Sequence, residues 1–102
     1  MDALTRIRRA ALRGALRFTQ KARDEMYRDD LDTEDVRESL VSASRVSKTL
    51  RSRTEQGRRG DLLYVVKSRS FAGTIIYTKG TFRREADAEV FYVLVSAKAS
   101  TD

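Results

Sequence analysis

The apolar positions of the chain follow a helical period in its first half and a strand period in its second half. Leu4, Ile7 and Ala11 lie three or four residues apart, which predicts a helix over residues 3–13. Gly14 is placed to end this helix, because glycine readily adopts the left-handed conformation of a helix terminus. The chain is therefore expected to begin with an amphipathic helix.

Two further helices are predicted before the period changes. Thr19 is a suitable N-cap for a helix that runs to Arg28, with Ala22 and Met26 as its apolar pair one turn apart. Thr33 is a suitable N-cap for a helix with two carboxylates in its first turn, where they complement the helix dipole. The buried stripe of this third helix is predicted to consist of Val36, Leu40 and Ala43.

From residue 45 onward, apolar and polar positions alternate in the manner typical of β-strands. Strands are predicted at residues 45–53, 61–69, 74–84 and 89–98, with connections at 54–60, 70–73 and 85–88. Short connections make neighbouring strands antiparallel, and helices that precede strands are typical of an α+β domain. The expected fold has three N-terminal helices packed on one face of a C-terminal antiparallel sheet of three to four strands.

The alternation also predicts which side chains of the sheet are buried. The core face is expected to carry Leu63, Val65, Ile76, Phe91, Val93 and Val95. If no bulge shifts the alternation, the other face carries Tyr64, Tyr77, Tyr92, Lys79 and Lys98. The two faces would therefore differ sharply in polarity.

The composition limits the chemistry that is open to the chain. Its 102 residues are enough for a single domain spanning residues 1–102. It contains no cysteine and no histidine, which excludes disulfide bonds, thiolate metal sites and the most common general base. The acidic run Asp29–Asp35 lacks the alternating ligands and the glycine of a calcium loop. Turn and capping roles are predicted for it, and no metal or cofactor is expected.

The charge distribution points to an anionic partner. The net charge is +6, which favours a polyanion or an acidic protein. Residues 1–23 and 45–102 are basic, whereas residues 24–44 are acidic. A stripe at helical spacing, consisting of Arg6, Arg9, Arg13 and Arg17, is either a solvated face or a contact for phosphate or an acidic partner protein. The acidic region Asp24–Glu38 leaves open a regulatory adaptor that docks through its helices.

The N-terminal residues do not resemble a secretory signal, because arginines interrupt what would have to be an apolar run. No apolar run approaches the length that spans a membrane. A cytoplasmic protein that does not associate with membranes is expected.

Basic residues and tyrosines in the predicted strands suggest chemistry on RNA. Metal-independent cleavage of RNA needs a base for the 2′-hydroxyl, an acid for the leaving oxygen, and cations for the phosphate. The candidate catalytic residues are Lys48, Tyr77, Lys79 and Lys98. The candidate RNA-binding residues are Arg51, Arg53, Lys67 and Arg69. These residue types also suit a noncatalytic RNA- or protein-binding module, which is the alternative hypothesis.

Four segments, in the same order, resemble a known family. They are ALRFTQKARDEM, DVRESLVSASRVSKTLRS, GTIIYTKG and EVFYVLVSAK, and together they extend over most of the chain. The chain resembles the MqsR family of toxin–antitoxin mRNA interferases, which are relatives of the RelE-type ribonuclease toxins. The closing SAKAS also resembles the end of BrnT-type toxins. The first segment resembles, in addition, a small domain family of unknown function, which keeps the noncatalytic alternative open.

The resemblance implies a RelE-like endoribonuclease that cleaves single-stranded mRNA and is neutralised by an acidic antitoxin. It implies that Lys48, Tyr77 and Lys98 form the active-site cluster and that Lys79 matches the lysine two positions after the family's tyrosine. A serine and a threonine flank Lys48 where the family has an aromatic residue and a serine. Asp61-Leu62-Leu63 replaces a Trp-Gln-Asp stretch. A homodimer is one arrangement that the sequence leaves open.

Overall fold

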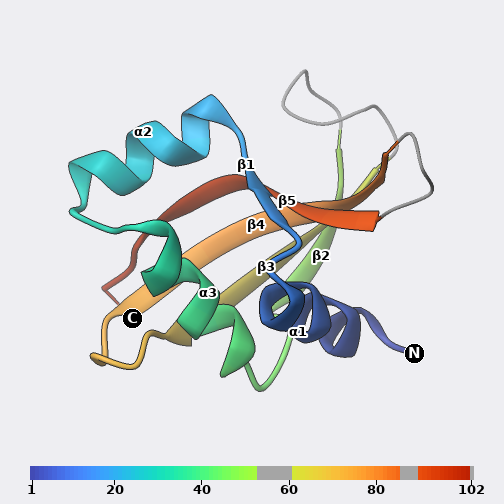
Figure 1. Ribbon diagram of the computed structural model, residues 1–102, viewed down its shortest axis with the longest axis horizontal. Coiled ribbons are helices and arrows are strands. Elements are labelled where there is room, and N and C mark those ends of the chain that lie inside the picture. Colours follow the sequence, from blue (N-terminus) through green and yellow to red (C-terminus); the bar gives the residue numbers. More distant parts are fainter. Residues whose placement is uncertain (53–60, 86–89, 102) are drawn as a thin grey trace.

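The computed structural model describes residues 1–52, 61–85 and 90–101 (Figure 1). Arg53, one of the predicted RNA-binding residues, lies outside this part of the chain. The elements are α1 (Ala3–Arg13), β1 (Leu16–Phe18), α2 (Gln20–Arg28), α3 (Thr33–Val41), β2 (Lys48–Arg51), β3 (Leu62–Arg69), β4 (Ile75–Arg84) and β5 (Val90–Ala99). The predicted α+β class and the N-terminal position of the helices are confirmed.

Local capping explains where the helices begin and end. The Asp2 carboxylate accepts a hydrogen bond from the Thr5 N–H at the start of α1, and Gly14 ends that helix at a φ of 73°. Thr19 caps α2 as predicted. The N-cap of α3 is Asp32 instead of the predicted Thr33, because Asp32 and Asp35 form a reciprocal capping box.

The sheet has five strands, not three to four, and it is mixed instead of purely antiparallel. The strand order is β1-β5-β4-β3-β2, with β1 parallel to β5 and all other pairs antiparallel. The prediction missed β1 because its three residues are too few to show an alternation. The predicted strand over residues 45–53 shortens to Lys48–Arg51 in the structure.

The helices do not all lie on one face of the sheet. Helices α1 and α3 pack together over one face, whereas α2 lies along β5, at the edge of the sheet that carries β1 (Figure 1). Strand β1 covers that edge only as far as Leu94. Beyond it, Glu25 of α2 and Asp29, the C-cap of that helix, accept hydrogen bonds from the N–H groups of Ala97 and Ala99, at 3.0 and 2.8 Å. These two carboxylates thus satisfy the sheet edge that β1 leaves open.

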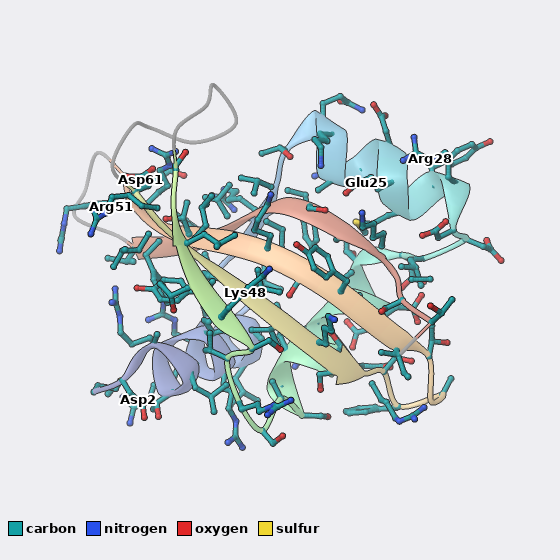
Figure 2. All side chains as sticks on the ribbon, turned by 180° about the vertical axis from the view of Figure 1, so that it is seen from behind. Asp2, Glu25, Arg28, Lys48, Arg51 and Asp61 are labelled. Carbon is teal, nitrogen blue, oxygen red and sulfur yellow. The ribbon has the colours of Figure 1, made fainter. Side chains whose placement is uncertain are left out.

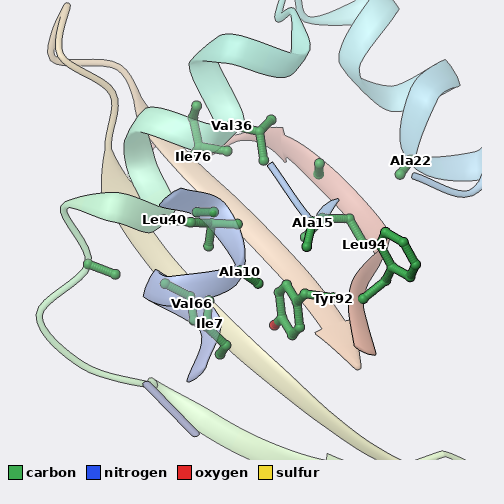
Figure 3. Close-up of a cluster of buried hydrophobic side chains, with 14 of the residues drawn as sticks. Ile7, Ala10, Ala15, Ala22, Val36, Leu40, Val66, Ile76, Tyr92 and Leu94 are labelled. Atoms are coloured by element: carbon green, nitrogen blue, oxygen red, sulfur yellow. The ribbon is translucent and has the colours of Figure 1, made fainter. Parts of the chain in front are cut away.

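The face under α1 and α3 carries the main core, where Ile7, Leu40 and Ile76 are fully buried (Figure 3). Tyr92 is also fully buried there, and Tyr64 packs against the same cluster. Placing these two tyrosines on the opposite face was therefore wrong. The predicted core set is confirmed in part, since Ile76 and Phe91 belong to this cluster, whereas Val65 is buried on the opposite face, between Lys48 and Lys79.

Two physical causes account for this error. Strand β3 is buried on both sides, since Val65 and Val66 are each 1% exposed, so its polarity pattern does not distinguish the faces. In β5, a bulge opposite Lys79 and Gly80 shifts the alternation, so that Tyr92 and Lys98 lie on opposite faces.

Candidate functional site

The structure brings the four predicted catalytic residues to one face of the sheet. Side chains directly opposite each other on paired strands point to the same face. Lys48 of β2 lies opposite Val65, Val65 lies opposite Lys79 of β4, and Lys79 lies opposite Ser96 of β5. This row crosses four strands on the side away from α1 and α3.

A second row lies beside the first. Lys67 of β3 is opposite Tyr77 of β4, and Tyr77 is opposite Lys98 of β5. We call the surface formed by Lys48, Lys67, Tyr77, Lys79 and Lys98 the open face. Figure 2 views the sheet from this side, with Lys48 on β2 and Glu25 on α2 labelled. The sequence segments that carry these residues are far apart, so the register of the sheet is what assembles the open face.

Tyr77 occupies the centre of the second row. It is half-buried, and the Lys98 ammonium lies 5.3 Å from the centre of its ring, within the range of a cation–π contact. Burial raises the pKa of the Tyr77 hydroxyl, and the negative charge of Glu25 raises it further. Tyr77 is therefore protonated at neutral pH, which suits it to donate a proton or a hydrogen bond and not to act as a base.

Glu25 borders the open face and was not singled out from the sequence. It is 6% exposed, and its carboxylate accepts hydrogen bonds from the Ser96 hydroxyl at 2.7 Å, the Ala97 N–H at 3.0 Å and the Lys21 ammonium at 2.9 Å. The Lys21–Glu25 spacing of four residues was the one signal available, and such pairs are common on exposed helices. The structure makes Glu25 a support that joins α2 to β5 beside Tyr77.

The surroundings of Glu25 favour its charged form. Burial raises the pKa of its carboxyl group, but the hydrogen bonds from Ser96, Lys21 and Ala97 together lower it more, so the net shift is downward. The pKa in the folded protein therefore lies below that in the unfolded chain. Between the two values the unfolded chain binds more protons, so Glu25 stabilises the fold at neutral pH and this stabilisation is lost on acidification.

We expect the Glu25→Gln variant to be less stable than the parent protein at neutral pH and to differ from it less in acid. The difference in unfolding free energy between the two proteins should shrink as the pH falls from about 5 to about 2. Protonation of Glu25 over this range removes the charge by which the two proteins differ. Urea unfolding of both proteins across this range measures the effect. A difference that stays constant with pH would show that the charge of Glu25 does not stabilise the fold.

The predicted RNA-binding residues are not all brought together. Lys67 lies on the open face, and with Arg69 it lines a hollow of about 440 Å³ beside Arg45. Arg51 lies opposite Leu62, so it points to the other side of the sheet from Lys48. The structure therefore supports Lys67 and Arg69 as neighbours of the cluster and separates Arg51 from it.

The arginine stripe near the N-terminus serves mainly to pack α1 and β1 against the sheet. The Arg6 guanidinium lies 3.9 Å from the ring centre of Phe82, and that of Arg17 lies 3.7 Å from the ring centre of Phe91. Arg13 donates a hydrogen bond to the Val90 carbonyl at 3.3 Å. These contacts favour a structural role for most of the stripe over a phosphate-binding one.

Within the described parts of the chain, no group of three or more acidic side chains is arranged to hold a metal ion. No helix among the described residues is long and apolar enough to cross a membrane. Comparison of the chain with models of protein families, with curated proteins and with solved structures found no match.

Proposed function

We propose that the chain is a toxin-type mRNA interferase whose open face binds single-stranded RNA and cleaves it without a metal ion. The observation that carries this proposal is the register that gathers Lys48, Lys67, Lys79 and Lys98 around Tyr77 on one side of the sheet. Clustered lysines attract the phosphate backbone, and the exposed part of the half-buried Tyr77 ring offers a surface on which a base can stack.

The residues of the open face match the needs of RNA cleavage. In the proposed reaction the ribose 2′-oxygen attacks the adjacent phosphorus, the bond from phosphorus to the 5′-oxygen breaks, and a 2′,3′-cyclic phosphate forms. Tyr77, which is held in its protonated form, donates a proton to the leaving 5′-oxygen. Lys48 or Lys98 holds the attacking ribose and serves as the general base for its 2′-hydroxyl. Lys79 stabilises the negative charge on the phosphate oxygens.

The distance between the strands determines which part of the RNA each of these residues can reach. Lys48 and Lys79 are separated by β3, so their backbones are about 10 Å apart at the usual spacing between strands. Tyr77, Lys79 and Lys98 lie on adjacent strands and surround the scissile phosphate in this proposal. Lys48 then reaches the same phosphate or a neighbouring one along the strand of RNA.

The cellular role that we propose for this ribonuclease is that of a toxin. It rests on the resemblance of four ordered segments to the toxin family and on the register that sets Tyr77 opposite Lys98 and beside Lys79. An acidic antitoxin that covers the basic open face would neutralise the enzyme by excluding RNA. Induced expression without this antitoxin should then arrest growth.

The decisive test uses purified protein and a short single-stranded RNA in the presence of EDTA. We expect cleavage that yields a 2′,3′-cyclic phosphate and a 5′-hydroxyl, and no cleavage of the same oligonucleotide made entirely of deoxynucleotides. Binding of the RNA without cleavage would contradict the nuclease and select the noncatalytic RNA-binding module. Absence of both binding and cleavage would contradict both functions.

The salt dependence of RNA binding tests the contribution of individual lysines. Each phosphate contact on a single strand adds about 0.7 to the slope of log K against log salt. We expect Lys67→Ala to reduce this slope by about 0.7, since it removes one such contact. The matched control is Arg8→Ala, which removes an exposed positive charge from α1. An equal loss of slope in both variants would show that net charge, and not the open face, binds RNA.

A further inference from the structure

Strand β3 extends beyond the strand that pairs with its outer edge. β2 pairs with β3 only along Lys48–Arg51, and the Ser47 N–H donates a further hydrogen bond to the Val65 carbonyl at 2.7 Å. Before Ser47 the chain turns away toward α3 (Figure 1). β3 continues to Arg69, paired with β4 on its inner side. Beyond Val65, the outer edge of β3 therefore has no partner strand among the described residues.

The backbone of this edge is oriented toward the space that β2 leaves. In an antiparallel sheet, alternate residues direct both their N–H and their C=O to the same neighbouring strand. The carbonyl of Val65 points to the β2 side, and that of Val66 accepts from the Thr78 hydroxyl on the β4 side at 3.1 Å. Lys67 and Arg69 therefore direct their polar backbone groups outward, and no described segment forms backbone hydrogen bonds with them there.

The space beside this edge is strongly basic. It is a hollow of about 440 Å³, lined by Arg45, Ser47, Lys67, Ser68, Arg69 and Ile75. Three of the lining residues are cationic and none is acidic. Arg69 is held in place by a hydrogen bond of 2.8 Å from its guanidinium to the Gly73 carbonyl. The nearby Glu38 carboxylate is engaged by the Phe71 N–H at 2.9 Å.

We propose that an extended acidic peptide docks at this edge as an additional strand, in the position that β2 leaves. The outward N–H and C=O groups of Lys67 and Arg69 would pair with the peptide backbone, as in other cases of strand addition. Arg45 and Lys67 would pair with its carboxylates. A second copy of this chain is disfavoured as the occupant, because two such edges would bring the same cations together. The proposal stands independently of RNA cleavage.

Fluorescence anisotropy with a labelled peptide of alternating valine and glutamate tests this docking. We expect saturable binding to the full-length protein at moderate salt. Methylation of the peptide nitrogens, which removes the hydrogen-bond donors but keeps the charges, should weaken binding at least tenfold. The double substitution Arg45→Ala and Lys67→Ala should weaken it to a similar degree, whereas the double charge-matched control Arg8→Ala and Arg28→Ala should leave it unchanged.

Each result decides for or against the docked strand. Shifts of the Lys67 and Arg69 amide resonances on addition of the peptide would support it. Equal binding of the methylated and unmethylated peptides would overturn it, since charge alone would then explain the affinity. Self-association of the protein through this edge without peptide binding would also overturn it. A shift of these two amide resonances by single-stranded RNA, but not by the peptide, would overturn it as well.

Discussion

Replacement of Gly80 by alanine is expected to lower the free energy of unfolding by about 3 kcal/mol, toward the upper end of the usual cost of overpacking a core. A Cβ atom on Gly80 would lie 2.6 Å from Cζ and 2.8 Å from Cε2 of the Tyr92 ring. Tyr92 is fully buried, and its ring contacts that of Phe82 with centroids 5.0 Å apart. The ring therefore has little space into which it can move.

The control for this prediction is the same substitution in a Tyr92→Leu background. Tyr92→Leu is itself destabilising, because it removes buried aromatic atoms. It also removes the atoms that the new methyl group would meet, so Gly80→Ala should then cost about 1 kcal/mol or less. Urea unfolding of the four proteins gives the coupling between the two sites. Additive effects would show that the ring of Tyr92 is not what requires glycine at position 80.

Tyr77→Phe is expected to lower the rate of RNA cleavage by about 100-fold, as the loss of a general acid usually does. The substitution keeps the ring, and with it the contact to Lys98 and the surface available for stacking. RNA affinity should therefore change little. Cleavage rates under single-turnover conditions and binding constants for an uncleavable deoxy-substituted strand separate the two effects.

Comparison with Lys98→Ala sharpens this test. We expect that variant to lose both affinity and cleavage, because it removes a cation from the proposed phosphate site. The Arg8→Ala variant serves again as the charge-matched control and should cleave at the parent rate. If Tyr77→Phe cleaves RNA at the parent rate, its hydroxyl is not the acid and the proposed mechanism is wrong.

The helices were predictable because their signals are local. Thr19 caps α2 and Gly14 ends α1 as the sequence indicates, and each acts through neighbours within four residues. The shift of the third N-cap from Thr33 to Asp32 depends on a reciprocal contact with Asp35, which the spacing of three also permits. Local chemistry thus fixes an element, while neighbouring capping residues compete for its first position.

The arrangement of the sheet was less predictable because its determinants are not local. β1 is a strand only through its pairing with β5, which lies more than 70 residues later in the chain. The bulge opposite Lys79 determines the face on which Tyr92 lies, and no residue type in β5 predicts this bulge. The candidate residues Tyr77 and Lys79 could be placed together from their spacing alone. Only the structure, through the register of its strands, shows that they align with Lys48 and Lys98 and that Glu25 supports this site.

Photo-crosslinking is the most direct test of the open face as the RNA site. A p-benzoylphenylalanine in place of Tyr77 would lie at the centre of the open face, and the same residue in place of Leu12 would lie on α1, at a position that is 60% exposed. Irradiation with single-stranded RNA should give a crosslinked product from position 77 and none from position 12. A crosslink from position 12 alone, or from neither position while RNA is bound, would contradict the account.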